Sequence, residues 1–192
     1  MRRIFIGTLV VLTIALINGC ANRKITRVDP SETIDLSGRW NDSDSRLVSE
    51  EMIGDLLTSA WIPRYLKAND KRPVVVVGLV ENKSHEHINS ETFIKDVEKA
   101  IIRDGNIRLA VAGEKRNELR KERAEQQDYA SPETTKKWGK ELGADFILQG
   151  TINSIVDSYK KQKVVTYQID LQLTNIETNE VVWMGDKKIK KQ

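Results

Sequence analysis

Two histidines are the residues of this sequence whose types and spacing first suggest chemistry. His85 and His87 flank Glu86 in a polar stretch, and on an extended segment both imidazoles would project to the same side. Imidazoles are good ligands for transition metals, but the sequence offers no third ligand at a fixed spacing. We therefore expect two solvated loop histidines and no metal site.

Motifs for other kinds of catalysis are missing as well. The chain has no G-x-S-x-G nucleophile elbow, and Gly105 and Gly113 lie in no phosphate-binding loop. No pattern marks one carboxylate as buried beside an acid partner, as general acid–base catalysis requires. We predict that the protein is not an enzyme and takes no cofactor and no small-molecule substrate. The alternative of a metal-binding periplasmic enzyme would need bound metal or activity to be lost when both histidines are replaced.

The single cysteine, Cys20, lies where an apolar segment ends. Arg2 and Arg3 precede the segment, which runs from Ile4 to Ile17. Its roughly 14 residues suit a signal peptide and fall short of the 20 or so that span a membrane. Gly19 and Cys20 resemble a bacterial lipobox, which implies cleavage before the cysteine and acylation of its sulfur and nitrogen. Two or three acyl chains hold a protein firmly on a membrane.

This resemblance divides the chain into a signal peptide (residues 1–19), a short lipidated tether (residues 20–38) and a globular domain (residues 39–192). Ala21 follows the cysteine where an acidic residue could stand, which in proteobacterial lipoproteins implies an outer-membrane location facing the periplasm. The alternatives are an uncleaved membrane anchor and an ordinary secreted protein with one cysteine.

Charge and length restrict the function further. Removal of Arg2 and Arg3 with the signal peptide lowers the formal net charge from +3 to +1. A nearly neutral chain gives no basis for nucleic-acid binding. Once Cys20 is acylated, no thiol remains for a disulfide or a nucleophile. About 170 mature residues suit one domain and a tether.

The first part of the domain predicts an α/β arrangement. Asn41, Asp42 or Ser43 can cap a helix whose apolar residues recur every three or four positions from Val48 to Trp61, until Pro63 bends or stops it. A buried strand (74–80), a helix that Ser90 can cap and that Gly105 stops, and a short strand (107–111) then form a βαβ unit with a right-handed crossover.

The second part predicts two helices and a meander of strands. Residues 114–127 form a very polar helix, either a solubilising surface or a docking face, and Pro132 starts another helix that ends at Gly143. Strands follow at 146–156, 165–174 and 181–189, the second with one wet face. The predicted fold is a single α/β (α+β) domain with a mixed sheet of four to five strands and helices packed on it. Trp138 and Tyr159 belong either to the core or to an interface.

One segment resembles a known family. "SGRWNDSDSRLVSEEMIGDLL" (residues 37–57) is similar to the segment that precedes the first helix in the LpoB family, outer-membrane lipoprotein activators of bifunctional penicillin-binding proteins. The matching residues are Gly38, Trp40, Asn41, Asp42, Asp44 and Arg46. "VVVVGLVENKSHEHIN", "LGADFILQGTI" and "DLQLTNIETNEVVW" extend the resemblance over residues 36–190. The last two are shared with the TolB N-terminal domain and with CsgG-like lipoproteins.

The resemblance implies a TolB N-terminal-domain-like fold and a non-enzymatic role. It implies that the protein reaches through peptidoglycan, docks on an accessory domain of a bifunctional penicillin-binding protein and stimulates peptidoglycan synthesis. The tether differs from the family pattern, because its roughly 18 residues extend to at most about 60 Å and average about 20–25 Å as a coil. The alternative is a CsgG-like structural or secretion lipoprotein. The sequence leaves the docking surface open.

Trp40 raises a separate question, because it is a large aromatic residue at the end of a polar tether. We expect it to be the first core residue of the domain, with its ring over the helix that Asn41 to Asp44 cap.

Overall fold

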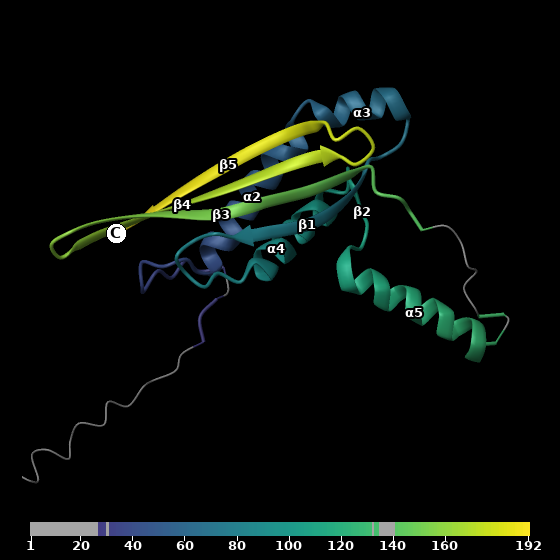
Figure 1. The fold of residues 1–192 in the computed structure, drawn as a ribbon, viewed down its shortest axis with the longest axis horizontal. Helices are drawn as coiled ribbons and strands as arrows, with labels where there is room; N and C mark the ends of the chain where they lie inside the picture. The colour runs from purple at the N-terminus through teal and green to yellow at the C-terminus, as the bar shows by residue number, and fades with distance from the viewer. Residues whose placement is uncertain (1–26, 30, 132, 135–140) are drawn as a thin grey trace, which may run out of the picture. The chain divides into compact units, whose positions relative to one another are not determined.

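The computed structural model describes residues 27–29, 31–131, 133–134 and 141–192. The chain separates into two units, Met1–Glu32 and Thr33–Gln192. The described part of the first unit is a turn in which Asp29 accepts hydrogen bonds from Ser31 and Glu32. The second unit is the α/β domain of Figure 1. Within the described ranges, no helix has the length and apolar character needed to cross a membrane.

Two helices stand where the apolar spacing predicts one long helix. Helix α2 (Asp42–Thr58) buries its predicted apolar face, but two residues separate its end from Trp61, where α3 (Trp61–Asn69) begins. Pro63 causes the break, because inside a continuous helix it would lack a hydrogen-bonding N–H and its ring would meet the preceding turn. In the first turn of α3 neither cost arises. Trp61 remains in the core, and its indole N–H donates to the Leu56 carbonyl at 2.9 Å.

The predicted order of strand, helix and strand is observed, but the second strand is shorter than the predicted 107–111 and the helix has a different cap. Strand β1 (Val74–Asn82), helix α4 (Ser90–Asp104) and the two-residue strand β2 (Arg108–Leu109) follow one another. The cap of α4 is Asn89 instead of Ser90, because the Asn89 side chain accepts hydrogen bonds from two backbone N–H groups of the first turn. Gly105 ends the helix with φ +78°, the left-handed conformation that glycine adopts most easily.

The rest of the described chain contributes one helix and three long strands. Helix α5 (Gly113–Tyr129) buries none of its residues, which agrees with the predicted solvated helix. The helix predicted from Pro132 to Gly143, with Trp138, falls largely outside the described residues. Strands β3 (Phe146–Tyr159), β4 (Gln162–Asn175) and β5 (Val181–Lys191) form the predicted meander.

The five strands form one mixed sheet in the order β2-β1-β3-β4-β5. Strand β1 pairs in parallel with β2 and β3, and the β3–β4 and β4–β5 pairs are antiparallel. Helices α2 and α4 pack against one face, which we call the inner face (Figure 1). The core lies between these helices and the inner face of the sheet. Every second residue of β4 is buried there: Val165, Tyr167, Ile169, Leu171 and Leu173. The predicted α/β fold is therefore confirmed.

Two glycines of the long strands lie where a side chain would not fit. Gly150 of β3 and Gly185 of β5 lie on either side of Leu171 in one row across the sheet. A Cβ atom on Gly150 would clash with the carbonyl oxygen of Asp170, and one on Gly185 would clash with the ring of Trp183. A glycine inside a strand often marks a close approach of another backbone, which is the case at Gly150.

Candidate functional site

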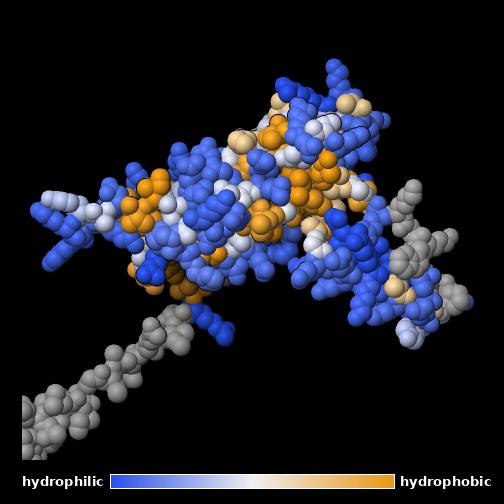
Figure 2. All heavy atoms as spheres, in the orientation of Figure 1, coloured by the Kyte–Doolittle hydropathy of each residue, from blue (hydrophilic) through white to orange (hydrophobic). Residues whose placement is uncertain are grey.

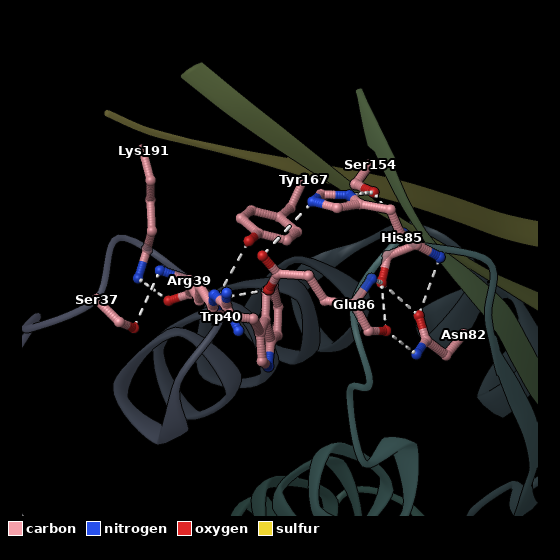
Figure 3. A network of polar contacts seen from close by, with 10 residues as sticks. Ser37, Arg39, Trp40, Asn82, His85, Glu86, Ser154, Tyr167 and Lys191 are labelled. Carbon is pink, nitrogen blue, oxygen red and sulfur yellow. Dashed lines mark hydrogen bonds and ion pairs between the residues drawn. The ribbon is translucent and has the colours of Figure 1, made fainter. Parts of the chain in front are cut away.

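The domain begins with a junction between the end of the predicted tether and the sheet. We define this entry junction as Trp40, Glu86, Tyr167, Asp44 and Lys191, and Figure 3 shows most of it. Trp40 is half-buried and packs edge-on against the buried Tyr167, with 5.6 Å between ring centroids. Its backbone N–H lies 3.2 Å from the Tyr167 hydroxyl and 3.3 Å from a Glu86 carboxylate oxygen. Trp40 therefore packs on the core, as predicted, but at its edge.

The loop after β1 positions Glu86. The Asn82 side-chain amide donates to the backbone carbonyl of Glu86 at 2.8 Å and to that of Ile88 at 3.3 Å. Ser84 also donates to the Glu86 carbonyl, at 3.1 Å. Regular backbone pairing ends with strand β1. In the loop that follows, the side-chain amide of Asn82 and the hydroxyl of Ser84 bond to the backbone instead, as Asn and Ser often do in turns. The Glu86 side chain is only 13 % exposed and points at the Tyr167 hydroxyl (Figure 3).

Tyr167 stays protonated in this environment. Burial raises the pKa of its hydroxyl, and the hydrogen bond and charge of Glu86 raise the pKa further, far above the ordinary value. The hydroxyl oxygen accepts from the Trp40 N–H at 3.2 Å. The buried phenol thereby has a polar partner, as buried tyrosines usually do.

The two histidines differ in their contacts. His87 is exposed, as expected, whereas His85 is exposed but held in place. Its Nδ1 lies 2.6 Å from the Ser154 hydroxyl, and its Nε2 lies 3.5 Å from a Glu86 oxygen. Among the described residues, no group of three metal-ligating side chains comes together.

Lys191 fastens the other side of the entry junction. Its Nζ lies 2.5 Å from Asp44, 2.9 Å from Asp35 and 2.9 Å from the Arg39 carbonyl oxygen. Burial lowers the pKa of Lys191, but the hydrogen bonds and charges of Asp44 and Asp35 outweigh burial, and the net pKa is raised. Asp44 also accepts from the Asn41 N–H at 3.0 Å, in a reciprocal capping box at the start of α2.

The contacts of the entry junction have a structural role: they hold one segment of the chain in place. The last strand, the loop after β1 and the first helix all hold the chain between Asp35 and Asp44. The arrangement fixes the segment from Asp35 to Asp44 on the folded domain.

The sheet face opposite α2 and α4, which we call the outer face, offers a second candidate site. Its strand residues alternate with the core residues, and in the described part of the chain no helix makes an extensive contact with it. Leu79 and Met184 are 64 % and 67 % exposed there, beside a shallow hollow of about 320 Å³. Figure 2 shows apolar atoms gathered over the strands near α3, between polar surroundings.

The β3–β4 hairpin extends beyond its neighbours in the sheet. Strand β5 pairs with β4 only from Val165 onward, so the tip around Tyr159 is exposed on both faces. Tyr159 is 69 % exposed with the Lys160 ammonium 5.1 Å from its ring centroid. The sequence predicts that Trp138 and Tyr159 belong either to the core or to an interface. Tyr159 lies at the surface, and Trp138 lies outside the described residues.

A family model decides the relationship. The model described as "Peptidoglycan-synthase activator LpoB" matches residues 44–189. The chain belongs to the LpoB family. The predicted resemblance is confirmed, although the matched region begins at Asp44 and leaves Gly38 and Trp40 outside it.

Solved structures give a weaker likeness. The LpoB C-terminal domain from Escherichia coli is 18 % identical at a TM-score of 0.45, and the alignment covers 76 % of this chain and 98 % of that one. The LpoB C-terminal domain from Salmonella enterica is 17 % identical at a TM-score of 0.40, covering 67 % and 91 %. Lipoprotein GNA1162 from Neisseria meningitidis is 13 % identical at 0.39, covering 62 % and 82 %. At TM-scores below 0.5 these likenesses add nothing to the family membership. No curated protein sequence matches significantly.

LpoB family members are activators, which agrees with the predicted non-enzymatic role. The sequence analysis missed three residues of the entry junction: Glu86, Tyr167 and Lys191. Tyr167 carries a signal, because a phenol at a buried position of an alternating strand requires a polar partner. Lys191 lies on the same, inner side of β5 as Trp183 and Ile189, so alternation along the strand places it facing the core. Its acidic partners, however, lie about 150 positions away along the chain, and the sequence does not show that they meet.

Proposed function

We propose that this LpoB family member is an outer-membrane lipoprotein that binds a bifunctional penicillin-binding protein and activates its synthesis of peptidoglycan. The family match over residues 44–189 is the observation that carries the proposal, because that family is named for activation of a peptidoglycan synthase. The exposed outer face supports a binding role. The entry junction is consistent with a domain that is attached to a membrane through its N-terminal tether.

The anchor of this lipoprotein is Cys20, acylated after removal of residues 1–19. More than one acyl chain is needed for stable attachment, which the lipobox pathway supplies. Replacement of Cys20 by alanine tests this step. The variant should lose incorporation of labelled palmitate and leave the membrane fraction, whereas palmitate labelling that persists would contradict the assignment.

The entry junction shortens the tether. Because Ile34 and Asp35 already contact Asn41 and Lys191, the part of the tether that precedes these contacts runs from Cys20 to about residue 33. Its roughly 14 residues extend to at most about 50 Å. A partner in the inner membrane must therefore present its accessory domain close to the outer membrane, or the envelope must be narrow at that point.

Binding and stimulation test the proposal directly. The full-length lipoprotein in detergent is mixed with the solubilised bifunctional synthase of the same organism, and glycan polymerisation is followed with labelled lipid-linked precursor. We expect a specific complex and a faster rate. The absence of both binding and stimulation would refute the proposal, and ring-shaped particles in electron microscopy would then favour the CsgG-like alternative.

A further inference from the structure

Three carboxylates lie in one row across the outer face of the sheet. Strand pairing places Glu81 opposite Thr151, Thr151 opposite Asp170, and Asp170 opposite Asp186. Side chains at such directly opposed positions have Cβ atoms about 4.5–5.5 Å apart, and like charges there destabilise a sheet. The row therefore places Asp170 and Asp186 in mutual repulsion in the free protein.

Within the described residues no ion pair is formed by either Asp170 or Asp186, although Lys188 lies on the same face of β5 two residues after Asp186. Glu81 pairs with Lys83 at 3.1 Å, but both side chains are more than half exposed, and such pairs contribute little. Asp170 accepts from the side-chain amides of Gln168 at 2.9 Å and Asn153 at 3.3 Å, which orient its carboxylate without cancelling its charge.

Exposed apolar side chains flank the row. The register of β1 against β3 shifts between Val77 and Val80, and this bulge contains Leu79. Bulges commonly redirect a side chain, and here Leu79 lines the same hollow as Met184, Asp170 and Glu81. Large apolar side chains next to oriented charges on a rigid sheet are the composition of a protein-binding surface.

We propose that the outer face around Asp170 docks a basic protein surface, in which arginine or lysine side chains meet the carboxylate row and apolar side chains cover Leu79 and Met184. Charge complementarity sets the sign of the partner, and the planar fork of arginine suits carboxylates held by amide neighbours. This inference rests on the proposed function, and the partner surface belongs to the accessory domain of the synthase. Binding relieves the repulsion within the row, so the face costs stability in the free protein and gains it in the complex.

Neutral variants of the row separate docking from folding. The double variant Asp170→Asn, Asp186→Asn keeps the shape of both side chains, and Glu180→Gln, in the exposed turn between β4 and β5, is the matched control. Affinity for the solubilised synthase is measured by biolayer interferometry at low and high salt, and thermal unfolding is recorded for each variant. We expect the double variant to bind about tenfold more weakly with a smaller salt dependence, while Glu180→Gln binds like the wild type. The melting temperature of the double variant should be equal to or above that of the wild type, because a repulsion is removed.

A third variant tests the apolar part of the surface. Met184→Ala should weaken binding about fivefold with little effect on its salt dependence, because an exposed apolar contact carries no charge. If the wild type binds and all three variants bind equally well, the outer face is not the docking surface, although the proposed function stands. If the wild type itself does not bind, the proposed function fails.

Sedimentation velocity examines the other possible occupant. The tip of the β3–β4 hairpin carries Lys160, Lys161 and Lys163 and could supply the basic surface from a second copy. A salt-sensitive self-association that the double aspartate variant abolishes would overturn the proposal, since the outer face would then bind this same chain. A monomer at all concentrations, together with the tenfold loss of synthase binding, supports it.

Discussion

Lys191 gives the sharpest test of the entry junction. Replacement by methionine keeps the length and the apolar stem of the side chain but removes the charge that Asp44 and Asp35 face. Lys190 is the matched control, because it is the neighbouring residue of the same strand, points to the outer face and is exposed. The entry junction predicts a large loss of stability for Lys191→Met and almost none for Lys190→Met.

The magnitude follows from the surroundings of the ion pair. Removal of one partner from a buried pair costs about 3–5 kcal/mol, because the other charge stays buried and unpaired. The Lys191 and Asp44 side chains are only 7 % and 11 % exposed, but Asp35 is 43 % exposed and can be hydrated. Asp44 also keeps the hydrogen bond from the Asn41 N–H. We therefore expect a loss of about 2–4 kcal/mol, somewhat below the range for fully buried pairs.

Thermal and urea unfolding followed by circular dichroism measure this loss. For a domain of this size the expected decrease in melting temperature is about 5–12 °C for Lys191→Met and within about 1 °C for Lys190→Met. The wild type and both variants are measured at pH 7 in the thermal and in the urea experiment. Equal melting temperatures for the two variants would show that the contacts of Lys191 do not stabilise the domain.

The pH dependence gives a second, independent readout. The pKa of Lys191 is raised above its ordinary value of 10.5, so the folded state binds its proton more tightly than the unfolded state. Its contribution is therefore complete below about pH 10.5 and is lost as the pH rises through the higher folded pKa. The difference in unfolding free energy between wild type and Lys191→Met should stay constant from pH 7 to 10 and decrease above that range. A difference that changes between pH 7 and 9 would contradict the assignment.

Three further predictions use matched substitutions and chemical or thermal unfolding. Trp40→Ala should cost about 1–3 kcal/mol, less than a fully buried ring, whereas Trp40→Phe should keep most of the edge-on ring contact; equal loss in both would point to the indole itself. Asn89→Ala should cost about 1 kcal/mol while Ser90→Ala stays within a few tenths, and the reverse order would restore Ser90 as the helix cap. Gly150→Ala should cost more than about 2 kcal/mol because its new Cβ meets a backbone carbonyl, whereas Gly54→Ala, with open space around it, should stabilise α2 by about 0.5–1 kcal/mol. A well-folded, stable Gly150→Ala would show that the sheet is looser than its close strand approach indicates.

Local sequence signals predict most of the elements. The alternation along β4 assigns its buried and wet faces correctly, because a strand turns successive side chains to opposite sides. The cap of α2 lies within the predicted set, since Asn41 and Asp44 are three residues apart and act on each other. The error at Ser90 is of the same local kind, because Asn89 is an equally good cap one residue earlier.

At the break after α2, the sequence predicts correctly that a helix stops but gives the wrong position for its end. Pro63 correctly predicts a stop, yet the helix ends at Thr58, because a proline can stand in the first turn of the next helix. Periodicity alone could not choose between one bent helix and two, since Trp61 and Ile62 are buried in either arrangement.

What the sequence alone determines about this protein is the set of interactions that act over a few residues: the caps, the strand alternation, the lack of catalytic motifs and the segments that resemble the LpoB family. Tertiary structure decides everything that depends on register between distant strands. It brings Tyr167 to Trp40 across 127 positions, Lys191 to Asp44, and three carboxylates into one row on the outer face. The physical reason is the two-residue period of the sheet, in which a shift of one position moves every side chain to the opposite face.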